Sequence, residues 1–435
     1  MLSRTVKLAL LVGVSAAALC VAGGLALAAA KTVTVMGTWG GQELEAFQKM
    51  VEPFEKSTGI KVDFTGTRDL ATVLSTRVAA GNPPDVAVLP NPGMMKELAA
   101  EGHLVDLATL LDVKELRKDY ADVWIDLGSY KNKLQAIFIS ADVKSLVWYN
   151  PKRFAEKGYT IPRTWDELTA LADRMAASGT KPWAIGLESG AASGWPGTDW
   201  IEDIMLRTAG PEVYDKWVNH DIPWTDPAVK RAFEIFGRIV KNDKYVFGGP
   251  AGALTTNFGD SVSALFTTPP RAYLHRQATF IQSFIKQSNP NVVAEKDYAF
   301  FALPPIDPKW GTPVLGAADM VAVFRATPEA KAFIRYLASA KAQELWVTSL
   351  GKVSANKQVP LSAYKDPLTR NAAQILVSAR VFRFDGSDMM PAAVGAGAFW
   401  KGILDYVGGE DLDSVLKSIE AAADQAYRTG AATNK

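Results

Sequence analysis

Residues 32–89 contain three short runs that predict β-strands: Thr32-Val33-Thr34-Val35-Met36, Ile60-Lys61-Val62-Asp63-Phe64 and Asp85-Val86-Ala87-Val88-Leu89. Their alternating or continuous apolar pattern is typical of strands. Residues 43–56, 69–80 and 94–101 follow these strands in turn and carry the patterning of helices. Strands that alternate with helices predict a parallel sheet with right-handed crossovers, and so an α/β fold.

A loop follows the carboxyl end of each predicted strand: Trp39-Gly40-Gly41, Gly66-Thr67-Arg68-Asp69 and Pro90-Asn91-Pro92-Gly93. Ligands of open α/β sheets bind beyond the carboxyl ends of the strands, so these loops should meet at one rim. They supply an indole face, a guanidinium beside a carboxylate, and an amide. Each loop alone is also ordinary turn chemistry, but their shared position predicts a site for a polar ligand.

The first 30 residues have the pattern of a secretory signal peptide. Two basic residues precede an apolar run that starts at Leu8 and ends in Ala28-Ala29-Ala30. The run also has the length of a membrane anchor, about 20 residues, but its Ala and Gly content and its small-residue exit favour cleavage after Ala30. A lipid-modified Cys20 is disfavoured because it follows Leu19. We therefore expect an exported, periplasmic protein whose mature chain has no cysteine.

Composition narrows the possible functions. The 435 residues include 47 basic and 46 acidic ones, which does not favour a nucleic-acid or anionic membrane partner. The length suits two or so domains of about 150 residues each. Several of the 12 tryptophans stand beside Gly, Pro or Asp. Tryptophan faces next to carboxylates suit sugars, although we expect about two-thirds of the tryptophans to be core residues.

The remaining chain alternates predicted helices and strands. Residues 134–149 are strand-rich, and Thr164 with Glu167 forms a capping box at a helix start. Residues 183–224 should be loop and short helix. Amphipathic helices are predicted over 328–339 and 412–427.

At this point the chain resembles a known family, the extracellular solute-binding proteins of bacterial ABC importers, in the carbohydrate-binding branch that includes maltose-binding protein. The resemblance spans the mature chain. It is carried by three stretches of sequence, of which the first and third are specific in combination. The carriers are Phe54-Glu55-Lys56-Ser57-Thr58-Gly59-Ile60-Lys61-Val62, Ala80-Gly81-Asn82-Pro83-Pro84-Asp85-Val86, and Ser145-Leu146-Val147-Trp148-Tyr149-Asn150-Pro151 followed by Pro162-Arg163-Thr164-Trp165-Asp166-Glu167-Leu168. Residues 188–200 and 383–388 look like the members that bind α-glucosides.

The resemblance implies a two-lobe periplasmic-binding-protein fold, with sugar held in the cleft and crossover strands acting as hinges. One lobe is expected from 31–141 plus 316–352, and the other from 146–312 plus 358–435. Hinges are expected near 141–145, 313–316 and 352–357. The implied partners are a saccharide and the ABC permease subunits, and the protein is expected to be a monomer without a cofactor or metal.

The resemblance also implies ligand-binding residues. In the first lobe and at the first crossing these are Trp39, Gly40, Glu43, Arg68, Asp69, Asn91, Lys144 and Asp319. In the second lobe they are Trp195, Asp199, Trp200, Asp260, Arg271, Arg383 and Trp400. Arg271 and Tyr273 stand where relatives often carry a stacking tryptophan, which makes an acidic sugar more plausible. Asp319 and Arg383 are equally suited to hinge or interlobe ion pairs.

Two other classes of protein compete with a binding protein. A secreted glycosidase needs paired carboxyls, and Asp199, Glu202 and Asp203 could imitate such a pair. A surface adhesin or scaffold would favour repeats, cysteines or sheet-rich segments, none of which is evident in the sequence. His103, His220 and His275 lack metal-ligand spacing. The favoured function is capture of an α-glucoside or small oligosaccharide, with an acidic or modified sugar or a polyol as the alternative.

Overall fold

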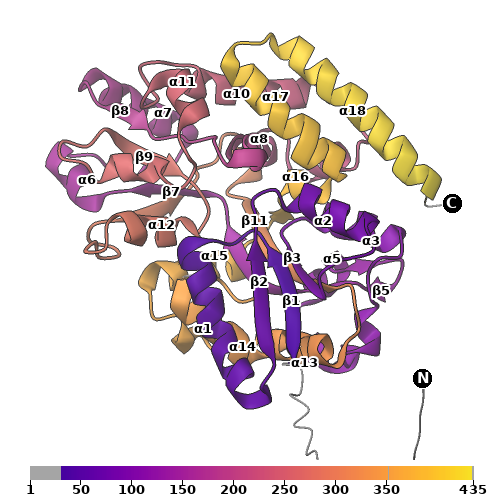
Figure 1. Ribbon diagram of the computed structural model, residues 1–435. Helices are drawn as coiled ribbons and strands as arrows, with labels where there is room; N and C mark the ends of the chain where they lie inside the picture. Colours follow the sequence, from indigo (N-terminus) through magenta and orange to yellow (C-terminus); the bar gives the residue numbers. More distant parts are fainter. Residues whose placement is uncertain (1–30, 351, 434–435) are drawn as a thin grey trace, which may run out of the picture.

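The computed structural model describes residues 31–350 and 352–433, which form two α/β lobes (Figure 1). Within these residues the strands build a six-stranded sheet, a four-stranded sheet and a two-stranded ribbon. The predicted two-lobe α/β architecture is confirmed. The predicted signal peptide at 1–30 lies outside the described residues. Among the described helices, none has the length and apolar character needed to cross a membrane.

The first lobe begins with the alternation expected from the sequence. Strand β1 pairs in parallel with both β2 and β3, as a right-handed β-α-β-α-β unit requires. Gly59 ends the first helix with a φ of 69°, a left-handed conformation that glycine adopts without strain. The elements are β1 (Thr32–Gly37), α1 (Gly41–Thr58), β2 (Lys61–Gly66), α2 (Leu70–Ala79), β3 (Val86–Leu89) and α3 (Pro92–Ala100).

The chain leaves the first lobe after a short helical stretch and one long strand, and it later returns. The leaving elements are α4 (Val113–Asp119), α5 (Asp122–Leu127), β4 (Ser129–Tyr130), β5 (Lys133–Leu134) and β6 (Ala136–Val143). The returning elements are β11 (Val314–Val323), α13 (Pro328–Ala338), α14 (Ala340–Leu350), α15 (Pro367–Ser378) and β12 (Phe382–Phe384). Strand β11 pairs antiparallel with β3 and β6, so the return segment completes the sheet.

The second lobe surrounds a four-stranded sheet with helices. Its strands are β7 (Leu146–Tyr149), β8 (Lys181–Trp183), β9 (Ala272–Arg276) and β10 (Ala299–Ala302). Its helices up to the return are α6 (Pro151–Lys157), α7 (Trp165–Ala177), α8 (Trp195–Thr208), α9 (Pro211–Val218), α10 (Pro227–Val240), α11 (Gly249–Thr255) and α12 (Ile281–Ser288). Its last helices are α16 (Gly386–Met389), a π-helical segment (Ala393–Phe399), α17 (Trp400–Gly408) and α18 (Leu412–Thr433), which runs along the outside of the lobe (Figure 1).

The predicted capping box at the start of α7 is present in altered form. The hydroxyl of Thr164 accepts from the backbone N–H of Glu167, while the Glu167 carboxylate reaches back to the N–H of Arg163. Residues 183–224 hold more helix than expected, since α8 has 14 residues. The Trp-, Gly- and Asp-rich composition there reflects buried packing of α8 rather than loop structure.

The chain crosses between the lobes at three adjacent places. The backbone N–H of Lys144 donates to Leu315, and that of Asp385 donates to Gly316, so the crossing segments lie side by side. The third crossing therefore falls near Asp385 and not at 352–357. The expected boundary at residue 358 also differs from the structure, because β12 pairs with β11 and α15 contacts β6 of the first lobe.

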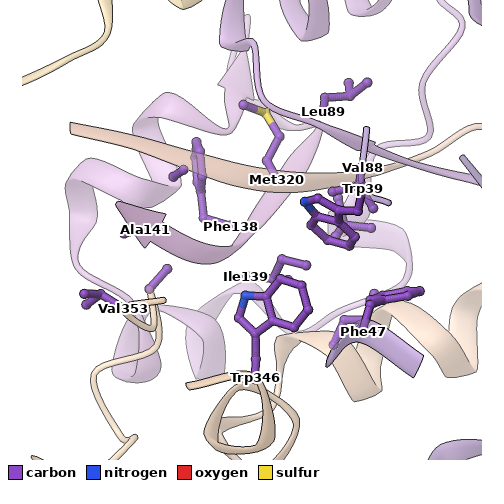
Figure 2. Close-up of a cluster of buried hydrophobic side chains, with 14 of the residues drawn as sticks. Trp39, Phe47, Val88, Leu89, Phe138, Ile139, Ala141, Met320, Trp346 and Val353 are labelled. Carbon is purple, nitrogen blue, oxygen red and sulfur yellow. The ribbon is translucent and has the colours of Figure 1, made fainter. Parts of the chain in front are cut away.

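Eight of the twelve tryptophans, all of which lie in the described residues, are buried. Trp39 is one of them, and its indole contacts both Phe47 and Trp346 in the core of the first lobe (Figure 2). This proportion agrees with the expectation that most tryptophans would serve the core. Trp195 and Trp400 are half-buried, which leaves part of each indole free for another surface.

Candidate functional site

A cavity of about 250 Å³ lies between the two lobes and receives residues from both. The three loops that follow β1, β2 and β3 all reach it, as expected from their place at the carboxyl ends of parallel strands. Thr38 and Trp39 come from the first loop, Arg68 and Asp69 from the second, and Asn91 from the third. The opposite wall includes Ser189, Trp195, Asp199, Phe258, Phe280, Asp388 and Trp400.

The helices that follow these strands have N-terminal residues whose side chains do not cap them. Asp69 occupies the N-cap position of α2 without a side-chain capping bond. Asn91 holds the same position in α3, and its amide donates instead to Asp388 of the second lobe. A capping bond would stabilise each helix by about 1 kcal/mol. Both side chains lack that bond and line the cavity instead.

Trp39 lines the cavity with very little of its indole exposed. One face is stacked on Phe64 at a centroid distance of 5.9 Å, and Trp346 lies 4.8 Å away at a tilted angle. Figure 2 shows the indoles of Trp39 and Trp346 next to each other. The side chain is 2% exposed. The expectation that Trp39 stacks on a sugar therefore does not fit its packing.

A buried lysine organises the first-lobe side of the cavity. The Lys352 ammonium lies 2.5 Å from Asp319, 3.4 Å from Asp142 and 4.0 Å from Glu43. Burial alone would lower the pKa of Lys352, but the surrounding carboxylates raise it far above its usual value. Burial raises the pKa of Glu43, which also faces Arg68 at 3.5 Å.

A second buried lysine stands at the first crossing. Lys144 donates to Asp199 at 2.9 Å and to Asp385, which joins the first crossing to the third. Burial opposes the charge of Lys144, yet Asp199 and Asp385 outweigh it and raise the pKa well above its usual value. The ion pairs continue through Arg276 and Asp203 to Arg207, so three aspartates face three cations in this chain of charges.

Two further acids form no ion pair within the described residues. Glu202 and Asp388 are both buried, and burial together with the nearby Asp385 raises the pKa of each well above its usual value. Their neutral forms are therefore favoured. Glu202 accepts from the backbone N–H of Ser387, and within the described residues its other oxygen has no hydrogen-bond partner.

The second lobe supplies an aromatic wall. Trp195 packs against Phe258 at 5.2 Å and Phe280 at 6.0 Å, and the Lys144 ammonium lies 5.3 Å from its ring. The Arg68 guanidinium of the first lobe lies 5.2 Å from the Phe258 ring, so this contact crosses the cleft. Apolar ring faces next to acceptor carboxylates make a surface that suits a molecule with both CH and OH groups.

Three polar atoms at the cavity are buried without a hydrogen-bond partner among the described residues: Trp400 Nε1, Ser189 Oγ and Asp199 Oδ2. The last also lies 3.4 Å from Arg276. A buried donor or acceptor left unpaired costs about 1–3 kcal/mol, which a bound molecule recovers by pairing with it. The residues that carry these atoms line the cavity, and they hold an indole N–H donor, a hydroxyl that can donate or accept, and a carboxylate acceptor.

The structure places five of the expected site residues outside this cavity. Gly40 and Asp260 line an adjoining cavity. Trp200 is 2% exposed and packs in the second core against Trp183 and Phe236. Arg271 is exposed beside Phe247. Arg383 makes a bidentate ion pair with Asp215, so the structure shows the ion pair that was the alternative to ligand binding for this residue.

Among the described residues, two clusters of three side chains have ligand atoms close enough together for a metal ion. The first joins His220, Glu420 and Asp424, and the second joins Asp199, Glu202 and Asp385. In the first, Glu420 already accepts from the backbone N–H of Trp224. In the second, Lys144 supplies the positive charge between two of the acids. Both groups are therefore explained by protein partners.

Comparison with known proteins identifies the family. A family model described as bacterial extracellular solute-binding protein matches residues 40–344. The chain belongs to this family. The solute-binding protein is 47% identical over 390 residues to the osmoprotective compounds-binding protein GgtB of Synechocystis sp., covering 90% of this chain and 92% of that one. It is 42% identical over 404 residues to the alpha-glucosides-binding periplasmic protein AglE of Rhizobium meliloti, covering 91% and 87%.

A solved structure supports the same fold. A chitin oligosaccharide binding protein superposes with a TM-score of 0.79 at 22% identity, covering 91% of this solute-binding protein and 99% of that chain. The predicted family and its two-lobe periplasmic-binding-protein fold are confirmed. Members of the family are extracellular binding proteins of transporters and not enzymes.

Sequence reasoning missed several cavity residues of this solute-binding protein: Asp142, Lys352, Asp385, Ser387 and Asp388. Asp142 had a signal, since it is the one charged residue of strand β6. Asp385 and Asp388 lie in a segment already singled out by the resemblance, in which Arg383 was preferred for its charge. Lys352 had no local signal, because its three acid partners come from distant parts of the chain.

Proposed function

We propose that this chain is the substrate-binding component of an ABC sugar importer. It captures a neutral α-glucoside or small oligosaccharide and delivers it to the membrane permease subunits as a monomer. Removal of the signal segment after Ala30 would release it in the periplasm. The observation that carries this proposal is a cavity between two lobes that combines aromatic faces with buried, unpaired hydrogen-bonding atoms.

The charge of the cavity favours a neutral ligand over an acidic sugar. Seven carboxylic acids line it against three cations, Arg68, Lys144 and Lys352, so the acids outnumber the cations even with Asp388 neutral. Each of these cations already has a carboxylate within 4.0 Å. An ionised carboxylate is an acceptor only, so it suits the donating hydroxyls of a neutral sugar and repels an anion.

The names of two relatives support two ligand classes. AglE is named for alpha-glucosides and GgtB for osmoprotective compounds, at similar identity to this chain. An α-glucoside is our first proposal, and a modified sugar or a polyol is the second. Hydrolysis is not proposed, because Asp203 is held by Arg207 and Arg276 while Glu202 does not line the cavity.

A thermal-shift screen of the mature chain tests the proposal. Neutral α-linked disaccharides should raise the melting temperature, uronic acids should not, and chromatography should detect no hydrolysis product. Stabilisation by acidic sugars alone, or release of glucose, would contradict it.

Trp195→Ala tests the aromatic wall. Loss of the ring face should weaken sugar binding about tenfold, equivalent to ~1.4 kcal/mol. Titration calorimetry measures the change. Trp310→Ala is the matched control, because Trp310 is also half-buried but lies outside the cavity. Unchanged affinity in Trp195→Ala would remove this residue from the site.

A further inference from the structure

The crossing segments between the lobes line a further cavity, of about 610 Å³. We call it the hinge cavity, and the cavity of the candidate site the cleft cavity. Lys144 lines the cleft cavity, whereas the next residue, Ser145, lines the hinge cavity. On β11, Asp319 lines the cleft cavity and Val314 lines the hinge cavity. The crossing segments therefore form the wall between the two cavities.

The hinge cavity has walls from both lobes. Residues 308–312, which follow β10, form one side together with Arg207 of α8. The end of α15 and residues 379–381, which precede β12 in the first lobe, form the other. Its volume lies within the usual range for ligand pockets, about 300–1,000 Å³, so it has room for a small molecule.

The hinge cavity is positively charged. Arg207, Lys309 and Arg380 line it, and none of its described lining residues is acidic. Asp307 precedes this stretch, but it does not line the cavity, and its carboxylate accepts from the backbone N–H of Lys309. A concave surface with cations and without carboxylates attracts anions. This charge is the reverse of that of the cleft cavity, where acids outnumber cations.

Arg207 is a fixed part of the wall. Its guanidinium is buried, pairs with Asp203 at 2.5 Å, and donates to the backbone carbonyls of Leu303 and Pro313. These contacts hold α8 against the second crossing. Since its hydrogen bonds are already made within the protein, Arg207 contributes charge to the cavity and leaves direct pairing to the other two cations.

Lys309 and Arg380 are the two cations available to a ligand. Both are exposed, and the ion pairs found within the described residues include neither of them. The Lys309 ammonium lies 4.2 Å from the ring of Trp310, which in turn packs so closely on Gly210 that a Cβ there would meet it at 2.5 Å. One cation on each wall can pair with two anionic groups of one molecule.

We propose that the hinge cavity binds a small organic anion with two or more carboxylate or phosphate groups, held by Lys309 of the second lobe and Arg380 of the first. The lobes are closed on the cleft side, where Asn91 donates to Asp388 across the cleft. An anion that fits the hinge cavity in this arrangement favours it, so the anion and the sugar should strengthen each other's binding. This coupling rests on the proposed function, whereas the anion site does not.

Titration calorimetry of the mature chain with citrate and with pyrophosphate, at an ionic strength held constant with sodium chloride, tests the anion site. At least one of them should bind with one-to-one stoichiometry. Lys309→Gln combined with Arg380→Gln should weaken that binding about tenfold or more, because both charge-assisted pairs are lost. Binding of citrate alone or of pyrophosphate alone would identify the ligand groups as carboxylates or as phosphates.

Arg231→Gln combined with Lys365→Gln is the matched control. It also removes one lysine and one arginine, one from each lobe, at exposed positions outside both cavities. This variant should bind the anion as the unaltered protein does. The site would be overturned if neither anion bound, or if the Lys309 and Arg380 variant bound it with full affinity.

The coupling is tested with the disaccharide that gives the largest shift in the thermal screen. Saturating anion should raise the affinity of the unaltered protein for this sugar about fivefold or more, and should leave that of the Lys309 and Arg380 variant unchanged. Equal sugar affinity with and without the anion would overturn the coupling. Failure of every sugar to bind would instead overturn the proposed function, while the anion titrations would still decide the hinge cavity.

Discussion

Lys144 is the buried cation that two buried carboxylates share. It lies between Asp199 and Asp385 at the point where two crossings meet. Lys144→Met would leave two buried carboxylates without their shared cation. Removing one partner of a buried ion pair costs about 3–5 kcal/mol, and we expect a loss of that size in urea unfolding.

Lys401→Met is the control for this substitution. Lys401 pairs with Asp405 on the surface of α17, four residues along the helix, and such pairs contribute about 0.3–0.5 kcal/mol. Its stability should be nearly unchanged. Similar losses in the two variants would mean that the buried chain of charges contributes little.

His275 should make stability depend on pH. Its ring is buried, its Nδ1 donates to Ala184, and burial lowers its pKa to about 4. The unfolded chain binds this proton near its usual pKa of about 6.5. The stabilisation is therefore complete above pH 6.5 and is lost as the pH falls toward 4. From pH 7 to pH 5 the loss is about 2 kcal/mol.

Urea unfolding of His275→Gln at both pH values measures this contribution. The amide can still donate to Ala184 but does not titrate, so the variant should lose less stability than the unaltered protein. His103→Gln, at an exposed position, should behave like the unaltered protein. Identical pH dependence in all three proteins would exclude a role for His275.

At the scale of elements, α3 and α16 meet more closely than a side chain allows. A Cβ on Gly93 would lie 2.0 Å from the carbonyl oxygen of Met390 in the second lobe. Gly93→Ala must therefore separate the two helices, and we expect a loss of about 1–3 kcal/mol in thermal unfolding. Gly397→Ala is the control, since its nearest neighbour would lie at 3.5 Å. Equal melting temperatures would show that this contact yields without cost.

The elements near the N-terminus could be predicted from sequence, whereas the later assembly could not. Local apolar periods predict β1 to α3, and the parallel-sheet rule predicts that their loops share one cavity. The pairing of β11 with β3 joins segments more than 200 residues apart, and no local pattern specifies it. For the same reason α15 and β12 were expected in the second lobe, although they pack in the first.

The residues of the candidate site were likewise predicted where a local pattern specifies them and missed where distant segments do. Arg68, Asp69 and Asn91 were found because strand ends predict them. Lys352 and Asp385 were missed because their role depends on acids or bases brought from elsewhere. Trp200 and Arg383 were selected for their residue type. In the structure Trp200 packs in the core of the second lobe, and Arg383 forms an ion pair with Asp215.

At the scale of the whole molecule, ligand binding should stabilise both lobes together. Both lobes line the cavity, so a bound ligand should stabilise them as one unit. A ligand at 100 times its Kd adds about 2.7 kcal/mol to the free energy of unfolding. Scanning calorimetry with saturating sugar should show the entire unfolding transition moving to higher temperature. Two transitions, of which one stays in place, would place the ligand in a single lobe.

The late position of β11 has a consequence for how the chain folds. The first lobe contains the N-terminal strands, yet its sheet lacks β11 until residue 323 is available and lacks β12 until residue 384. Pairings between such distant segments form slowly. During synthesis the N-terminal strands therefore lack their partners β11 and β12 until most of the second lobe has been made. We expect the sheet of the first lobe to be completed only then, at about the same stage as the second lobe.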